Sequence, residues 1–312
     1  MTTAHAPGKI ILFGEHAVVY GRPAIAVPLL QLQATGEVTD LSDSPRGNVW
    51  LQASAVDLSC WLHECPTHNP LAKVVRLTLA EVRAVDPPAL SVRVTSQIPI
   101  ASGLGSGAAV SVAVIRALSE HLGSPLPLER QSSIAFEVER LHHGTPSGVD
   151  NTVITFSQPV YFVRGTPPES FKIGRRFELA IGVSDMPAPT AVAVSTVRQG
   201  WLTDPERYDD LFDAIGHISE QARRVIHSGQ PEALGPLMDE NQDLLEELGV
   251  SSSALRELIL AARASGALGA KLSGAGLGGN VIALVTPETR ERVLRAYESA
   301  GAIMTMHTQV RN

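Results

Sequence analysis

Three glycine-containing segments, at residues 7–21, 99–109 and 271–279, hold side chains whose types could do chemistry. The chain has only four lysines, and two of them, Lys9 and Lys271, lie in these segments. A lysine beside a glycine turn can reach a carboxylate or a phosphate as a point charge. Because the net charge of the chain is −7, an anionic ligand would need such local positive groups.

The middle segment, Pro99-Ile-Ala-Ser-Gly-Leu-Gly-Ser-Gly-Ala-Ala109, lies between a predicted strand, 90–96, and a predicted buried helix, 108–122. Its glycines can adopt positive φ and place no Cβ between the backbone and a ligand. A glycine loop that opens a helix presents free N–H groups and the positive end of the helix dipole. Both features attract phosphate, so this loop is a candidate phosphate site.

Other interpretations of the loop compete with this one. It is no Walker A loop, because Gly107 is not followed by Lys and Ser or Thr. The pattern Gly103-x-Gly105-x-x-Ala108 fits a dinucleotide fingerprint, but residues 123–127, where an acidic residue should end a second strand, read as a loop. A tight strand-to-helix turn without any ligand stays open as the alternative.

The carboxylates near glycine turns are candidates for acid–base chemistry. Asp150 follows a turn at 144–148 and lies in an apolar stretch, 149–156, beside a predicted strand. A carboxylate that a rigid turn holds in place can act as a general base, and the alternative is an aspartate that caps its own turn. Glu15 and His16 interrupt two apolar runs, either as functional groups or as solvated residues of a hairpin.

The two cysteines lie close together, with two histidines nearby. Cys60, His63, Cys65 and His68 do not have the spacing of a common zinc site. We therefore expect a solvent-facing loop or short helix in a reducing compartment.

Length and composition set limits on the class of protein. A chain of 312 residues with 44% hydrophobic and 18% charged residues can bury a large core, and its length suggests two domains. No apolar run reaches 18 residues and the N-terminus lacks the features of a signal peptide, so we expect a cytoplasmic protein without a membrane partner. The negative charge also argues against nucleic acid as a partner.

The elements that must position these residues begin with strands. We predict two short strands at 6–21, further strands at 23–41 and 48–53, and helices at 70–85 and 127–143. This order is no regular alternation of strands and helices, which disfavours a dinucleotide fold. After a strand at 158–165, the segment 166–176 is the predicted linker to a second domain.

The second domain is predicted to be of the split β-α-β kind, with helices on an antiparallel sheet. Its predicted strands are 177–183, 280–285 and 302–309. Its predicted helices are 191–198, 205–228, 231–247, 251–264 and 287–299.

Taken together, the three segments resemble the motifs of the GHMP small-molecule kinases. The matching stretches are Pro7-Gly-Lys-Ile-Ile-Leu-Phe-Gly-Glu-His-Ala-Val-Val-Tyr-Gly21, Pro99–Ala109 and Lys271-Leu-Ser-Gly-Ala-Gly-Leu-Gly-Gly279. Within the family, 14–21 and 136–151 look like the members that act on mevalonate. Three motifs in this order are far more specific than a single glycine loop.

The resemblance implies an α+β fold with the two-domain architecture of these kinases. Residues 1–170 would form the N-terminal, ribosomal-S5-like α/β domain with the phosphate loop. Residues 171–312 would form the C-terminal, ferredoxin-like α+β domain. The implied reaction is ATP-dependent phosphorylation of the C5 hydroxyl of (R)-mevalonate to 5-phosphomevalonate, with Mg²⁺ as cofactor. The resemblance is also the only ground for expecting a homodimer.

The resemblance assigns roles residue by residue. Asp150 matches the catalytic aspartate that accepts the hydroxyl proton, and Lys9 matches the lysine that keeps this carboxylate ionised and stabilises charge at the attacking oxygen. Glu139 matches the carboxylate that holds Mg²⁺. The implied ATP-binding residues are Pro99, Ile100, Ala101, Ser102, Gly103, Leu104, Gly105, Ser106, Gly107, Ala108 and Ala109. The implied substrate-binding residues are Lys9, Glu15, His16, Asp150, Arg164, Thr190, Ser273, Gly274 and Ala275, with Arg164 neutralising the mevalonate carboxylate.

One position departs from the family pattern. Where the family usually has a second serine that binds Mg²⁺, this chain has Gly107. The metal would then rest on Glu139, phosphate oxygens and water, with Ser106 as a substitute ligand, which Mg²⁺ tolerates because it commonly keeps several waters.

Three alternative functions stay open at this stage. The first is another GHMP kinase that acts on phosphomevalonate, homoserine or a sugar. The second is a non-catalytic sensor that binds ATP and a small ligand, and the third is an NAD-dependent enzyme.

Overall fold

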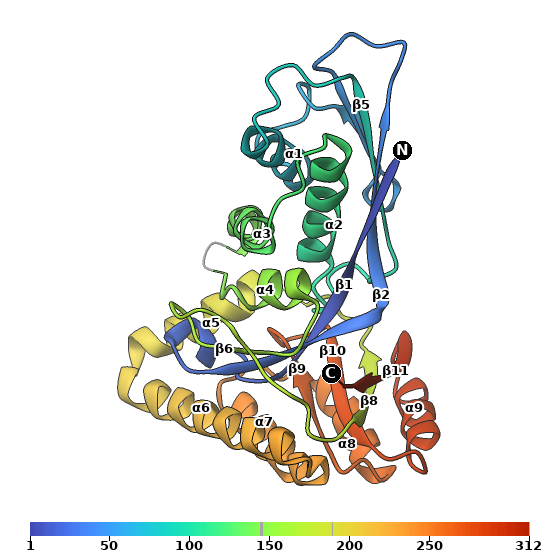
Figure 1. Cartoon of the computed structure of the whole chain (residues 1–312). Coiled ribbons are helices and arrows are strands. Elements are labelled where there is room, and N and C mark those ends of the chain that lie inside the picture. Colours follow the sequence, from blue (N-terminus) through green and yellow to red (C-terminus); the bar gives the residue numbers. More distant parts are fainter. Residues whose placement is uncertain (144–145, 189, 312) are drawn as a thin grey trace. The chain divides into compact units, whose positions relative to one another are not determined.

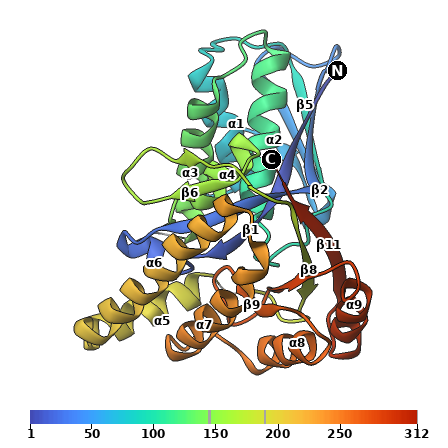
Figure 2. The same ribbon diagram turned by 60° about the horizontal axis from the view of Figure 1, so that its bottom comes forward.

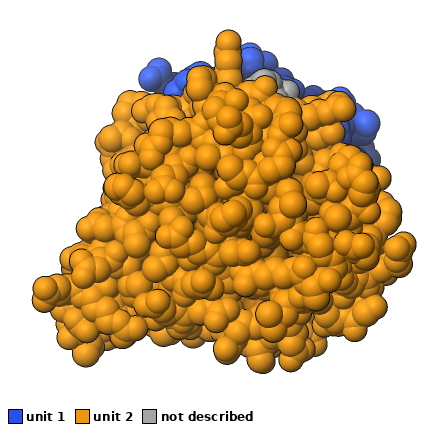
Figure 3. Space-filling model, turned by 90° about the horizontal axis from the view of Figure 1, so that it is seen from below, with its two compact units in different colours: residues 1–8, 29–99, 105–157 blue, residues 9–28, 100–104, 158–312 orange. Residues whose placement is uncertain are grey.

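The computed structural model describes residues 1–143, 146–188 and 190–311, and the chain divides into two compact units (Figures 1 and 3). Unit 1 holds residues 1–8, 29–99 and 105–157, and unit 2 holds residues 9–28, 100–104 and 158–312. The strands β1 (Thr2–Phe13) and β2 (Ala24–Asp40), which pair with each other, contribute residues to both units. The mixed α and β architecture confirms the predicted fold class, whereas the predicted domain boundary at residue 170 stays a prediction.

Unit 1 contains a sheet in the order β4-β3-β5-β2 and the helices α1 to α4. The strands β3 (Val49–Ala53) and β5 (Leu90–Ser96) fall close to the predicted ranges. A further strand, β4 (Leu58–Trp61), was not predicted, and a short 3₁₀ helix, η2 (Ser54–Val56), separates it from β3. β5 runs antiparallel to β2 and parallel to β3. The buried side chains of β5, at Leu90, Val92 and Val94, alternate as expected for a strand with one covered face.

Three helices of unit 1 begin close to where the sequence signals predict, and a fourth was not predicted. α1 (Pro70–Glu81) begins after Asn69, whose side chain accepts a hydrogen bond from the Ala72 N–H, with a proline in its first turn. α2 (Ser106–His121) and α3 (Leu128–His143) also match their predicted ranges. α4 (Val149–Phe156) is a helix made almost wholly of buried residues, so the apolar stretch 149–156 belongs to no strand.

The first segment of unit 2, residues 9–28, includes the connection between β1 and β2. Here the expected second short strand is instead a 3₁₀ helix, η1 (Ala17–Tyr20), because the backbone turns sharply at Gly14 and His16, which both have positive φ. β2 pairs with β6 (Val160–Phe162), and β6 pairs with β7 (Glu169–Ser170), a short strand inside the predicted linker. Arg22 ties this region to Asp209 and Asp213 of a long helix, α6 (Pro205–Ser228).

The rest of unit 2 is a four-stranded antiparallel sheet with helices, the split β-α-β kind predicted for the second domain, although its strand at 269–273 was not predicted (Figure 2). The sheet order is β11-β8-β10-β9, which is the order of a split β-α-β fold. Its strands are β8 (Phe177–Val183), β9 (Gly269–Ser273), β10 (Asn280–Val285) and β11 (Met304–Val310). Its helical elements are α5 (Thr190–Thr203), α6, η3 (Pro231–Ala233), α7 (Leu234–Glu247), α8 (Ser253–Ala264) and α9 (Arg290–Ser299).

The two faces of this sheet differ in what covers them. Ala270 and Leu272 of β9 and Val281 and Ala283 of β10 belong to one buried apolar cluster with side chains of α6 to α9. Because side chains alternate along a strand, Lys271 and Ser273 point to the opposite face. Asn280 is the cross-strand partner of Ser273 and therefore shares that face. The polar residues of β9 and β10 thus gather on the face away from α7, α8 and α9.

Two further observations bear on the sequence analysis. Among the described residues, no helix is long and apolar enough to cross a membrane. Cys60, in β4, and Cys65, in the turn after it, are joined by a disulfide. The prediction of a solvent-facing loop or short helix is wrong, because Cys60 lies in a strand and Cys65 is buried, and a disulfide is not the state expected in a reducing compartment. With both sulfur atoms in this bond, the pair cannot also serve as thiolate ligands for zinc.

Candidate functional site

The glycine loop leads from β5 into α2 with an unusual backbone. Ala101, Gly103 and Gly105 all have positive φ, and Gly105 is the residue that caps the helix. Among described contacts no side chain caps the helix, so the first N–H groups of α2 are left for another acceptor. Gly107 is exposed, and a Cβ placed on it would meet no atom within 4 Å. This end of α2 has the properties of an anion site.

Asp150 lies in the first turn of α4, directly after Gly148, whose φ is 94°. It is half-buried, and the helix dipole stabilises a carboxylate at this position. The sequence predicted that Asp150 follows a turn at 144–148, of which residues 144 and 145 lie outside the described residues, and that it lies beside a strand, whereas it lies in a helix. The structure of residues 149–156 was predicted wrongly because the periodicity of apolar residues does not distinguish a short buried helix from a strand.

Glu139 lies on α3 and is only 8% exposed, so it is no ordinary solvated helix residue. Burying a carboxylate costs free energy unless charge or hydrogen bonds compensate for it. α3 packs against both α2 and α4, so the helices that carry Ser106, Glu139 and Asp150 are mutual neighbours in unit 1.

Lys9 lies in the part of β1 that belongs to unit 2 and is only 3% exposed. Its backbone N–H donates a 3.0 Å hydrogen bond to the carbonyl oxygen of Leu104, in the glycine loop. Lys9 and the first half of the loop are therefore neighbours, although 95 positions separate them in the sequence.

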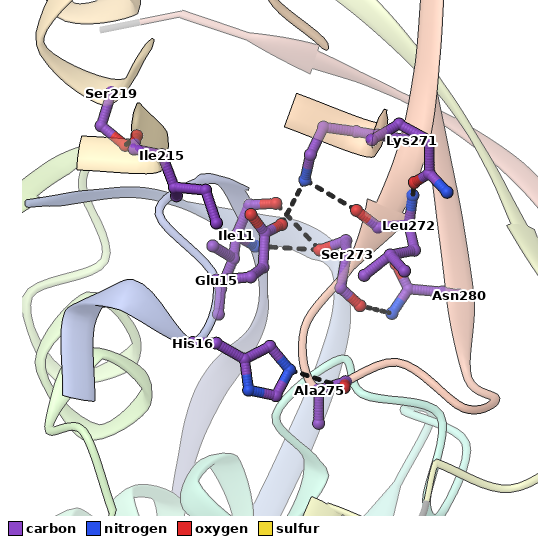
Figure 4. Close-up of polar contacts among 11 residues, drawn as sticks. Ile11, Glu15, His16, Ile215, Ser219, Lys271, Leu272, Ser273, Ala275 and Asn280 are labelled. Atoms are coloured by element: carbon purple, nitrogen blue, oxygen red, sulfur yellow. Dashed lines mark hydrogen bonds and ion pairs between the residues drawn. The ribbon is translucent and has the colours of Figure 1, made fainter. Parts of the chain in front are cut away.

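A fully buried ion pair joins Glu15 to Lys271 (Figure 4). The Lys271 ammonium also donates a 2.7 Å hydrogen bond to the Leu272 carbonyl, while Oε2 of Glu15 has no hydrogen-bond partner. Burial lowers the pKa of Lys271, and the Glu15 carboxylate opposes this shift. Glu15, which the sequence analysis assigned to substrate binding, thus has a partner inside the protein.

His16 follows Glu15 in the sequence and forms a hydrogen bond with the loop after β9. Its Nε2 lies 2.8 Å from the Ala275 carbonyl oxygen, so this nitrogen carries the proton and donates it. Burial lowers the pKa of the ring, which favours the neutral imidazole. A positive φ is uncommon for a residue with a side chain, and the bond to Ala275 holds His16 in that conformation.

Ser273 completes the connection between β1 and β9. Its hydroxyl accepts a 3.1 Å hydrogen bond from the Ile11 N–H and donates a 2.9 Å bond to the Ile11 carbonyl oxygen. The contacts described above therefore bring together residues from β1, from the turn after it and from the end of β9 and its loop, namely Ile11, Glu15, His16, Ser273 and Ala275. Figure 4 shows these five residues. Lys9 lies two residues before Ile11 on β1, and Gly274 directly follows Ser273.

Two predicted substrate-binding residues lie elsewhere in unit 2. Arg164 is exposed just after β6, and its Nη1 donates a 2.9 Å hydrogen bond to the Val19 carbonyl oxygen. Thr190 is the half-buried first residue of α5. Their roles stay predictions.

The sequence analysis assigned no role to two buried polar residues of this region, Lys271 and Asn280. Lys271 had been singled out by its position in a glycine-rich segment, but its partner is 256 residues away. Asn280 is an amide at the start of an otherwise apolar strand, directly after two glycines. Such a buried amide needs hydrogen-bond partners, and that need was the signal that could have drawn attention to it.

Comparisons with known proteins agree with these motifs. Residues 69–158 match the family described as GHMP kinases N terminal domain, and residues 222–303 match GHMP kinases C terminal. Mevalonate kinase of Thermococcus sibiricus is 35% identical, over 96% of this chain and 93% of the relative. Mevalonate kinase of Pyrococcus furiosus is 36% identical over the same shares.

Solved structures extend the comparison. Mevalonate kinase of Methanococcus jannaschii matches with a TM-score of 0.85 and 25% identity, over 99% of this chain and 98% of that one. Mevalonate kinase of L. major, solved in complex with R-mevalonate, matches with a TM-score of 0.82 and 28% identity, over 100% of this chain and 96% of that one. The family matches and the full-length relatives lead to one conclusion: this chain belongs to the GHMP kinase family.

Proposed function

We propose that this protein is an ATP-dependent kinase that phosphorylates the C5 hydroxyl of (R)-mevalonate, giving 5-phosphomevalonate. The observation that carries the proposal is the near-full-length identity of 35–36% to two archaeal proteins named mevalonate kinase. The solved structure in complex with R-mevalonate supports the same substrate. In the described residues, the open N-terminus of α2 and the carboxylate at the start of α4 are features that such a reaction can use.

Phosphoryl transfer requires alignment and charge stabilisation more than covalent chemistry. In the proposed mechanism, the backbone N–H groups at 102–107 hold the ATP phosphates. Asp150 accepts the proton of the C5 hydroxyl as the oxygen attacks the γ-phosphorus. Lys9 stabilises negative charge at that oxygen. Each of these roles is the one that the resemblance to the family implies for the matching residue.

The residues present also suit a magnesium ion. Glu139 is a buried carboxylate on a helix that packs against the helix starting at Ser106, and both side chains offer the oxygen ligands that Mg²⁺ prefers. No cluster of three or more acidic, histidine or cysteine ligands occurs among the described residues, so water and phosphate oxygens would complete the coordination. When bound, Mg²⁺ neutralises charge on the phosphates of ATP.

The test is release of ADP with mevalonate, phosphomevalonate, homoserine or galactose as acceptor. We expect turnover with mevalonate and little with the other three. Preference for another acceptor would show that mevalonate is not the substrate, although the protein would still be a kinase of this family. ATP binding without turnover of any acceptor would favour the non-catalytic sensor.

The role of Asp150 has its own prediction. Asp150→Asn should bind ATP as the parent does and lose about 10²–10⁴-fold in kcat, the range of a positioned base. Asp43→Asn, which changes an exposed aspartate of unit 1, is the matched control and should leave kcat unchanged. Near-normal turnover by Asp150→Asn would remove Asp150 from the role of base.

Two finer proposals are added. The protein would act in the cytoplasm, where ATP is available, and would form a homodimer, for which the family resemblance is the only ground. The native mass of the purified protein tests the second proposal directly.

A further inference from the structure

Asn280 lies where the two glycine-rich segments of the chain meet inside unit 2. It is the first residue of β10 and only 1% exposed. Its side-chain nitrogen donates a 2.8 Å hydrogen bond to the Ser102 carbonyl oxygen and a 3.3 Å bond to the Ser273 carbonyl oxygen. Ser102 belongs to the glycine loop and Ser273 to the third motif, so one side chain is bonded to both.

Both acceptors are carbonyl oxygens, so only a side chain with two donor hydrogens can form both hydrogen bonds. An asparagine NH₂ group has two hydrogens and can donate to both oxygens. A hydroxyl or a thiol has one hydrogen, and an ionised aspartate has none. The other end of the amide, Oδ1, is buried and has no hydrogen-bond partner among the described residues. Such an unpartnered acceptor costs free energy, which indicates that the two donated bonds determine how Asn280 is oriented.

The surroundings of Asn280 fix the same part of the loop from other sides. A Cβ placed on Gly103 would lie 3.0 Å from the Asn280 nitrogen, and one on Gly279 would lie 3.0 Å from the Ser102 oxygen. The Ala188 N–H donates a 2.7 Å hydrogen bond to the Ala101 carbonyl oxygen. The loop residues 101–104 are therefore held closely, and the amide of Asn280 is the side-chain donor at the centre.

We infer that Asn280 is a positioning residue for ATP binding, because it fixes the Ser102 carbonyl so that the neighbouring N–H groups of the loop keep the geometry that receives phosphate. It touches no substrate itself and acts through the loop. The inference deepens the proposed function and rests on it, because it requires that residues 99–109 bind ATP.

Asn280→Asp is the sharpest variant, since it keeps the shape of the side chain and replaces the donor by an oxygen that faces two carbonyls. We expect the KM for ATP to rise about tenfold or more, as for the loss of hydrogen bonds at a buried site, with the KM for mevalonate within about twofold of the parent. Asn280→Ser keeps one donor and should give an intermediate rise, and it decides the question if Asn280→Asp does not fold.

Asn241→Ala is the matched control. Asn241 is also fully buried in unit 2, on α7, but neither atom of its amide has a hydrogen-bond partner. This variant should change the thermal midpoint and leave both KM values unchanged. If Asn280→Asp and Asn280→Ser also lower only the thermal midpoint, or raise both KM values equally, Asn280 has a merely structural role and the inference is wrong.

A loop variant separates the inference from the function on which it rests. Gly105 has a φ of 80°, so Gly105→Val strains the loop itself. An unchanged KM for ATP in Gly105→Val would show that the loop does not bind ATP, and the proposed function of the loop would fail. A raised KM in Gly105→Val together with normal KM values in both Asn280 variants would overturn the role of Asn280 alone.

Discussion

The two glycine-rich segments, 99–109 and 271–279, are similar in composition and differ in what requires their glycines. In the second segment the protein's own backbone leaves no room. A Cβ on Gly276 would lie 2.1 Å from the Val250 carbonyl oxygen, and one on Gly278 would lie 2.5 Å from the Pro187 carbonyl oxygen. In the first segment, a Cβ added to Gly107 would meet no described atom within 4 Å, whereas one added to Gly103 would lie 3.0 Å from the Asn280 side-chain nitrogen.

This difference separates two uses of glycine. The second segment is a turn between two strands, closed by packing and by buried polar contacts of Lys271, Ser273 and Asn280. The first segment opens a helix whose early N–H groups face no capping side chain. Glycine therefore permits internal close contact at Gly276 and Gly278, whereas at Gly107 it leaves space for an external ligand. Variants in each segment should have correspondingly different effects.

The largest effect on stability is expected at Lys271, where the second segment begins. Lys271→Met leaves the Glu15 carboxylate buried without its cation, so the free energy of unfolding should fall by about 3–5 kcal/mol. Urea denaturation measures this loss. Lys172→Met, at an exposed lysine, is the control and should change the free energy of unfolding little.

The double variant Glu15→Met with Lys271→Met sharpens the same prediction. Replacing both charges by apolar side chains removes the unpaired carboxylate, and such replacements are often neutral or stabilising. The double variant should therefore be more stable than Lys271→Met. A double variant as unstable as the single one would show that the lysine matters through packing and not through its charge.

The pair at Lys271 also shows where prediction from the sequence ends. The helix at 205–228 was predicted with both ends correct, because its signals are local: proline in the first turn and glycine after the last residue. The partner of Lys271 lies 256 residues away, and no local spacing encodes such a contact. Glu15 could therefore be noticed as an unusual residue, but not recognised as half of a buried pair.

Similar limits apply to the other differences. The short stretch 149–156 mixes apolar residues with Asp150, Asn151 and two threonines, so its sequence pattern does not distinguish a buried helix from a strand. Residues 17–20 form a 3₁₀ helix because His16 adopts a positive φ, which a bond to distant Ala275 supports. In each case, the information that decides the structure lies in tertiary contacts.

A smaller loss of stability is expected at Gly276. Gly276→Ala places a methyl group against the Val250 carbonyl at a φ of 78°, so the free energy of unfolding should fall by about 2–4 kcal/mol from overpacking and backbone strain together. Gly47→Ala separates the two causes, because Gly47 has a φ of 81° with no atom within 4 Å of an added Cβ. That control should lose only about 1 kcal/mol. Equal losses at both positions would refute close packing as the reason for Gly276.

The smallest effect on stability is expected at Gly107, where the comparison predicts a change in metal dependence instead. Gly107→Ser fits the open space, should leave stability within about 1 kcal/mol of the parent, and adds a hydroxyl to the first turn of α2. If Mg²⁺ binds beside Ser106 and Glu139, the added oxygen should lower the Mg²⁺ concentration that gives half-maximal activity. Glu139→Gln should raise that concentration, because it removes a charged ligand.

Gly107→Ala is the control for the hydroxyl, since its methyl group occupies the same space and supplies no oxygen. Titration of activity with Mg²⁺ at saturating ATP should give the parent midpoint for Gly107→Ala and a lower midpoint for Gly107→Ser. Identical midpoints for these two variants would mean that the start of α2 does not reach the metal. An unchanged midpoint in Glu139→Gln would also remove Glu139 from the metal site, and the open space at Gly107 would then serve the phosphates of ATP alone.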